Sequence, residues 1–220
     1  MDWFAPTDLY CERTAPGLFN EPFNALSNLA FLAAAAIATA RRPPRRDVFL
    51  WLLIAIVYLI AIGSTTFHML ANRWSLIADI GPIAAFIYAF FLYAMLRFVA
   101  LSWMVSLTVT VLFFIASYGF GVAIPAGTLN GSLGYLPALI GLIALGAYLF
   151  ARQYPAAPLL LSAAAVFLVS LTFRTIDLTV CNCMPTGTHF IWHALNAVVL
   201  YLALLSAMRF GGLAANASHA

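Results

Sequence analysis

The chain has 220 residues, of which 65% are hydrophobic and only 8% are charged, and its formal net charge is +3. A soluble domain carries roughly 25% charged residues, so this composition excludes a water-soluble globular protein and indicates an integral membrane protein. All the basic residues are arginines, and they are spread along the chain rather than clustered on one face. This distribution excludes nucleic acid as a partner.

Residues 1–23 form the most polar part of the chain. They start without the basic stretch of a signal peptide, so we expect no cleavage there. Asp8, Glu12 and Glu21 carry carboxylates, which are ligands that calcium and magnesium prefer. Their spacing matches no known calcium loop, so the residues alone favour a solvated acidic segment.

Seven apolar runs follow, each close to the length of about 20 residues that a helix needs to cross a bilayer. They cover residues 24–40, 47–68, 74–96, 99–121, 133–151, 157–176 and 186–208. The sequence therefore predicts an all-α integral membrane protein, a seven-transmembrane helix bundle. Its parts are an extracytoplasmic segment (1–23), a membrane domain (24–208) and a cytoplasmic tail (209–220).

The arginines predict the orientation of this bundle. If the N-terminus lies outside, seven arginines fall on the inner side and three on the outer side, with the largest group in "RRPPRR" at 41–46. Positive charge is enriched in cytoplasmic loops. The N-terminus is therefore predicted outside and the C-terminus inside.

Three histidines are predicted to meet on the outer side. His68 lies near the outer end of the second run, and His189 and His193 lie four residues apart at the outer start of the seventh. Residues at this spacing share one helix face. Three imidazoles leave one position of a tetrahedral zinc ion open, which is typical of catalytic zinc. The alternative is that the histidines only form hydrogen bonds between helices. His219, in the polar tail, has no predicted role.

Asp79 and Ser64 are predicted to lie near these histidines. Asp79 falls about 7–8 Å into the third run, where a carboxylate should face the bundle interior. It would hold a histidine, act as a general acid and base, or serve only in helix packing. Ser64 precedes His68 by four residues and could stabilise an oxyanion, although membrane serines commonly bond to their own backbone.

The cysteines and one charged pair mark the outer loops. Cys11 and Cys181 both fall outside, where a disulfide between them is permitted, and Cys183 is left over; a Cys/His zinc site is the competing interpretation. Arg174 and Asp177 stand three residues apart, and we expect them to pair.

Five ordered motifs resemble those of one family: "YCER…NEPFNALSN", "GSTTFH", the aspartate Asp79, "RTIDLTVC" and "GTHFIWH". Together they span about residues 8–205 and resemble the alkaline ceramidases, seven-span zinc amidases whose superfamily includes the adiponectin receptors. The resemblance implies zinc on His68, His189 and His193, Asp79 as the acid and base, and Ser64 as support for the oxyanion.

The same resemblance implies three further features. Asp8, Glu12, Glu21 and the carbonyl of Tyr10 would bind calcium. Cys11 and Cys181 would form a disulfide. The compact, lysine-free chain is similar to bacterial members, which implies an inner-membrane protein whose active site faces the periplasm.

The expected function is hydrolysis of a membrane lipid. Zinc and these side chains would cleave the amide of a ceramide-like lipid to a fatty acid and a sphingoid-type amine. Two alternatives remain open from the sequence: an esterase or phospholipase that uses the same site, and a non-catalytic lipid receptor that contains zinc.

Overall fold

The computed structural model describes residues 2–15, 17–41, 43–44, 46–125 and 127–212, so His219 lies outside the described residues. Over these residues the regular structure is helical, apart from one isolated β-bridge between Pro6 and Asn72. The helices are α1 (Pro22–Ser27), α2 (Leu29–Ala40), α3 (Val48–Leu70), α4 (Arg73–Arg97), α5 (Trp103–Ala123), the 3₁₀-helix η1 (Thr128–Tyr135), α6 (Leu136–Ala151), α7 (Ala157–Ile176), the 3₁₀-helix η2 (Asp177–Thr179) and α8 (His189–Phe210).

Seven segments of the described chain are long and apolar enough to cross a membrane. Each of α3, α4, α5 and α8 forms one span, while α1 with α2, η1 with α6, and α7 with η2 form the other three. Each segment overlaps one predicted apolar run, so the prediction of an all-α, seven-span membrane protein is confirmed.

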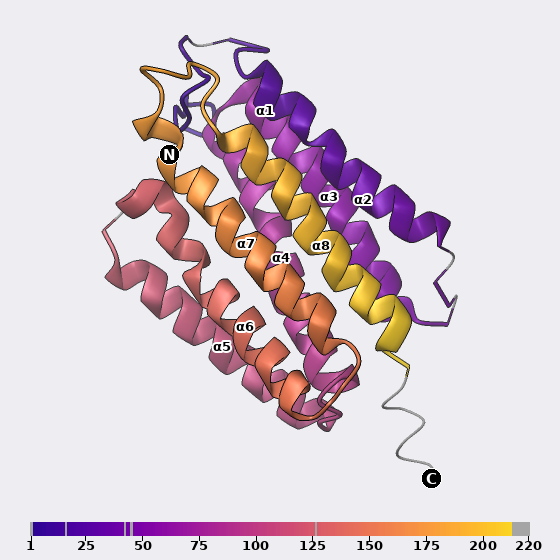
Figure 1. Cartoon of the computed structure of the whole chain (residues 1–220). Helices are drawn as coiled ribbons and strands as arrows, with labels where there is room; N and C mark the ends of the chain where they lie inside the picture. Colours follow the sequence, from indigo (N-terminus) through magenta and orange to yellow (C-terminus); the bar gives the residue numbers. More distant parts are fainter. Residues whose placement is uncertain (1, 16, 42, 45, 126, 213–220) are drawn as a thin grey trace.

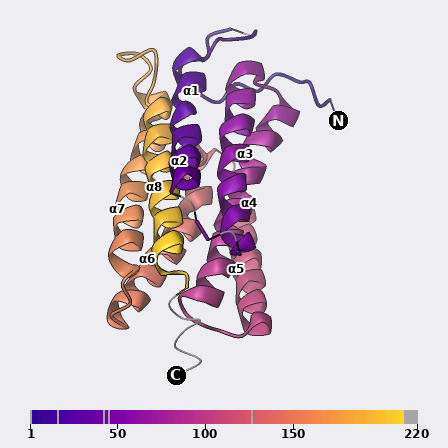
Figure 2. The same ribbon diagram turned by 90° about the vertical axis from the view of Figure 1, so that its right-hand side faces the viewer.

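The helices form one bundle in which two helix pairs make the most extensive contacts. These pairs are α3 with α4 and α7 with α8, and α8 also contacts α2 and α3. Figure 2 shows α7 and α8 on one side of the bundle and α3 and α4 on the other. The N-terminal segment and the α7–α8 connection lie together at one end, where α8 begins (Figure 1).

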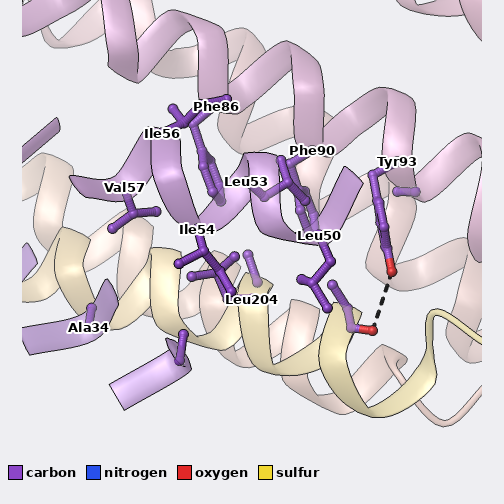
Figure 3. Packing of buried hydrophobic residues seen from close by; sticks show 14 of the residues in the cluster. Ala34, Leu50, Leu53, Ile54, Ile56, Val57, Phe86, Phe90, Tyr93 and Leu204 are labelled. Atoms are coloured by element: carbon purple, nitrogen blue, oxygen red, sulfur yellow. Dashed lines mark hydrogen bonds between the residues drawn. The ribbon is translucent and has the colours of Figure 1, made fainter. Parts of the chain in front are cut away.

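The half of the bundle away from this end is held by apolar packing. Leu50, Leu53 and Ile54 of α3 belong to one buried cluster with Tyr93 of α4 and Leu204 of α8, and Ile54 lies beside Leu204 (Figure 3). The Tyr93 hydroxyl donates to the carbonyl of Ala207 at 3.4 Å, so its polar atom is satisfied. Because lipid is as apolar as these side chains, their close van der Waals packing contributes more cohesion than their burial.

A close crossing joins α3 and α4 in the other half. A Cβ added to Gly63 would lie 1.9 Å from the carbonyl oxygen of Ala78, so only glycine permits this approach. Pro82 has no N–H to bond that same carbonyl four residues before it. The residues that follow, Ser64 on α3 and Asp79 on α4, both become buried there.

The N-terminal segment is fastened to this end of the bundle. The Thr7 N–H donates to the carbonyl of Ala71 at the α3–α4 turn, at 2.8 Å. Cys11 and Cys181 form a disulfide, which confirms that prediction. Among the described residues Cys183 is the free cysteine, and it is exposed. The segment therefore covers the end of the bundle where the predicted site residues gather.

Candidate metal centre

The three predicted histidines lie side by side inside the bundle. His68 is 0% exposed and His189 and His193 are each 2% exposed. Their ring centroids are 4.5 to 5.3 Å apart, and one ligand atom from each lies within 4.8 Å of the others. α3 and α8 thus form a buried three-histidine group that could hold a metal ion.

The hydrogen bonds of the rings leave a nitrogen on each ring for such an ion. His68 Nδ1 lies 2.5 Å from a carboxylate oxygen of Glu21, and His193 Nδ1 lies 2.7 Å from the hydroxyl of Ser27. Within the described chain, His68 Nε2 and His189 Nδ1 are buried with no hydrogen-bond partner. Buried polar atoms rarely stay unpaired in native proteins. Three imidazoles also match the donors that zinc prefers, so these residues fit a zinc ion.

Asp177 fixes the start of α8, the helix that carries two of the histidines. Its buried carboxylate accepts hydrogen bonds from the N–H groups of Thr188 (2.7 Å), His189 (2.9 Å) and Cys11 (3.0 Å). Gly187, which precedes Thr188, has a φ of +62°. A Cβ at this position would lie 2.2 Å from the Asp177 carboxylate, so glycine is required there. One carboxylate therefore anchors α8 and the N-terminal segment together.

The predicted pairing of Arg174 with Asp177 is wrong. The Asp177 carboxylate accepts hydrogen bonds from backbone N–H groups. Among the described residues it forms no ion pair with Arg174. The Arg174 guanidinium instead donates to the carbonyl of Asn130. It also lies 5.5 to 5.9 Å from the ring centroids of Tyr10, Tyr135 and Trp192.

A cavity opens beside the histidines and continues along the bundle. Asp79 and Ser64 line it together with His189, so the predicted acid and hydroxyl share one cavity with the candidate metal ligands. Its lining on α4 extends from Leu76 to Phe91, which is about 22 Å at 1.5 Å per residue. Most of the deeper lining is apolar.

Tyr10 covers the histidines from the N-terminal segment. Its ring stacks on His189 with centroids 3.6 Å apart, and burial raises the pKa of its phenol. Its carbonyl accepts the N–H of Arg13 in a tight turn at 3.2 Å. The side chain of Tyr10, rather than the carbonyl named in the calcium prediction, therefore contributes to the site.

Arg13 binds Glu21, one of the predicted calcium ligands. Its guanidinium donates from Nε to Glu21 (2.5 Å), from Nη1 to the carbonyls of Ala15 (3.4 Å) and Gly17 (3.2 Å), and from Nη2 to the carbonyl of His68 (3.2 Å). Burial raises the pKa of Glu21, but its hydrogen bonds to His68 and Arg13 outweigh this and leave the pKa below its usual value. An internal cation thus already neutralises this carboxylate.

The other calcium candidates have different surroundings. The two oxygens of Glu12 accept the N–H groups of Phe23 (2.7 Å) and Asn24 (2.9 Å) at the start of α1. Asp8 is exposed. Among the described residues, the three histidines are the only group of His, Cys, Asp and Glu whose ligand atoms converge on one point. In this arrangement the carboxylates of Glu12 and Glu21 accept hydrogen bonds from protein groups, and calcium binding by these acids stays a prediction.

Four residues of the site received no such role from the sequence. Glu21 and Ser27 hold two histidine rings, Asp177 anchors α8, and Gly63 permits the close crossing beside Asp79. Sequence spacing does not reveal them, because Glu21 and Ser27 act on residues 47 and 166 positions away and the other two act through backbone atoms. Only the polarity of "NEPFNALSN" within an otherwise apolar chain pointed to the segment that contains Glu21 and Ser27.

No family model matches the chain, and no curated protein is similar enough to count as a match. The three histidines and the cavity beside them are therefore the features of the structure that point to a function.

Proposed function

We propose that this protein is a zinc-dependent hydrolase of the membrane that cleaves the amide bond of a lipid, as the resemblance to alkaline ceramidases implies. The observation that carries the proposal is the buried group of His68, His189 and His193 beside a largely apolar cavity. Asp79 lines the same cavity, and among the described residues its Oδ1 atom is buried without a hydrogen-bond partner.

The three histidines would hold zinc, which when bound supplies a Lewis acid that polarises a carbonyl and makes water a stronger nucleophile. Glu21 and Ser27 keep two of the rings in fixed orientations through their Nδ1 atoms. A ring that is already held in one orientation loses less entropy when it binds the metal, which is the advantage of such hydrogen-bond partners.

Asp79 and Ser64 would handle the proton and the developing charge. The Asp79 carboxylate takes a proton from the attacking water as the new C–O bond forms, and Ser64 donates a hydrogen bond to the carbonyl oxygen as it becomes an oxyanion. Asp79 then returns the proton to the nitrogen as the C–N bond breaks. The products are a fatty acid and a neutral amine, so the aspartate ends the cycle as a carboxylate.

The test is Asp79→Asn, which keeps the side-chain shape and removes the base. We expect the purified variant to retain zinc, measured by elemental analysis, and to lose release of fatty acid from lipid amides. His193→Ala is the matched contrast, because it should lose both zinc and turnover. Full activity of Asp79→Asn would remove Asp79 from the mechanism.

The same assay separates the two alternative functions. A matched amide and ester with one acyl chain distinguishes an amidase from an esterase or phospholipase. A zinc-loaded protein that releases fatty acid from neither would instead be a lipid receptor.

We also propose that the site faces the outer side of a bacterial inner membrane, as the arginine distribution favours. Cys183 is exposed at the same end of the bundle as the site. Labelling of Cys183 in intact cells by a membrane-impermeant maleimide, with Cys183→Ser as the control, tests this orientation. Labelling only after lysis would reverse it.

A further inference from the structure

Arg174 is a charged side chain that the proposed reaction does not use. It lies near the end of α7 and lines the same cavity as Asp79 and His189. A charge inside a membrane protein is costly and marks a functional position unless the protein pairs it. The surroundings of Arg174 therefore decide what it does.

The protein holds Arg174 in place but does not neutralise it. Its Nη1 donates to the carbonyl of Asn130, and the Asn130 amide donates back to the Arg174 carbonyl at 3.0 Å. In the part of the chain that the structure describes, no carboxylate lies within 4.0 Å of the guanidinium, and its Nε is buried without a hydrogen-bond partner.

Aromatic rings surround the guanidinium and keep it close to the metal centre. Its central carbon is 5.9 Å from the ring of Tyr10 and 5.7 Å from the ring of Trp192. Tyr10 in turn stacks on His189. The positive charge thus stands one aromatic ring away from a metal ligand, at the polar end of the cavity.

We propose that Arg174 binds an anionic group on the head of the lipid, a few bonds beyond the scissile amide. The substrates would then be anionic lipid amides, with a carboxylate or a phosphate on the amine side, in preference to neutral ones. The planar guanidinium suits either group, because its parallel N–H donors match two oxygens of a carboxylate or phosphate. This inference rests on the proposed hydrolase function.

The fatty acid product does not explain this charge equally well. Its carboxylate is made from the scissile carbonyl, which the reaction holds at the histidines and Ser64. Arg174 contacts Tyr10 and Trp192, and both of these rings stack on His189, so we assign Arg174 to the amine side of the amide bond.

The experiment compares three lipids with one acyl chain and one amide: N-dodecanoylglycine, N-dodecanoylphosphoethanolamine and the neutral N-dodecanoylethanolamine. We expect kcat/KM to be higher for at least one of the anionic lipids than for the neutral lipid. The anionic lipid with the higher kcat/KM then shows whether Arg174 prefers a carboxylate or a phosphate. In Arg174→Gln the anionic-to-neutral ratio should fall roughly tenfold to hundredfold, the effect of losing a charge-assisted hydrogen bond. Arg174→Lys should keep part of the preference for anionic lipids, because lysine keeps the positive charge.

Arg73→Gln is the matched control, because Arg73 is an exposed arginine at the same end of the bundle and does not line the cavity. Its ratio should equal that of the wild type. A wild type without anionic preference, or an Arg174→Gln variant that slows all three lipids alike, would overturn the proposal and leave a structural role for Arg174.

A binding measurement separates this proposal from the proposed hydrolysis. If no lipid is cleaved, N-dodecanoylglycine and N-dodecanoylethanolamine are titrated against the intrinsic tryptophan fluorescence in detergent, to which Trp192 of the cavity contributes. Tighter binding of the anion that Arg174→Lys retains and Arg174→Gln loses would support the anion site without the reaction. Equal binding of both lipids would refute it.

Discussion

Two polar regions of this protein lie close together and differ in how their charges are satisfied. In the N-terminal polar cluster, formed by Glu12, Arg13 and Glu21, all four carboxylate oxygens accept hydrogen bonds. On the cavity wall, formed by Asp79 and Arg174, both side chains have a buried atom with no hydrogen-bond partner in the described chain.

The difference assigns separate tasks to the two regions. Satisfied buried charges hold a structure in one arrangement, and removing one partner leaves the other uncompensated. Unsatisfied charges beside a cavity are kept at a cost and await a ligand. We therefore expect substitutions in the first kind of region to reduce stability or metal affinity, and substitutions on the cavity wall to change turnover or specificity.

The largest expected effect on stability comes from Asp177, which is satisfied in the same way as the cluster. Asp177→Ala leaves three buried N–H groups without their acceptor. We expect a loss of about 3–5 kcal/mol of unfolding free energy, measured by denaturant unfolding in detergent micelles.

Asp47→Ala is the matched control, because Asp47 is also an aspartate at a helix start but accepts a single N–H, from Leu50. It also accepts the Tyr93 hydroxyl at 3.3 Å, which keeps the carbonyl of Ala207 as an acceptor in the variant. Loss of one N-cap costs about 1 kcal/mol. Equal losses in the two variants would show that Asp177 does not anchor α8 as its hydrogen bonds indicate.

A smaller effect is expected from Glu21→Gln, which connects the cluster to the metal centre. When zinc binds as proposed, through Nε2 of His68, the Nδ1 atom of this ring would carry the proton that Glu21 accepts. Loss of such a carboxylate partner weakens metal binding about 10- to 100-fold. Competition with a fluorescent zinc chelator measures this, and Glu12→Gln, which touches no histidine, should leave the affinity unchanged. An unaltered affinity in Glu21→Gln would show that Glu21 serves Arg13 alone.

Sequence reasoning was able to predict the features that depend on composition and on spacing within one helix. Hydropathy gave the seven spans, because each membrane helix satisfies its own backbone and reads as an apolar run. The spacing of His189 and His193 predicted that both lie on one helix face. The alternating direction of the spans predicted that His68, at the outer end of the second, lies at the same depth. The disulfide followed from the shared side of Cys11 and Cys181 together with the family resemblance.

The partners of each charge could not be predicted in the same way. Arg174 and Asp177 have the i, i+3 spacing of a helical ion pair. However, η2 begins at Asp177, and its carboxylate accepts a backbone N–H at the end of the following loop. Arg13 could engage any of several acids, and only the folded N-terminal segment brings it to Glu21. Such choices depend on which backbone atoms come near, and no sequence pattern encodes that.

The smallest expected effect is a pH dependence that separates the two acids of the cluster. Burial raises the pKa of Glu12 above its usual value of 4.5, although the N–H groups of Asn24 and Phe23 act in the opposite direction. Between the unfolded and the folded pKa the folded protein binds more protons, so stability falls as pH rises through that range. The melting temperature should therefore fall more for the wild type than for Glu12→Gln when the pH is raised from about 4 to about 7. Glu21, whose pKa is lowered, contributes the opposite slope to both proteins and cancels in the comparison. A larger loss in Glu12→Gln would mean that the two N–H groups, rather than burial, control the titration of Glu12.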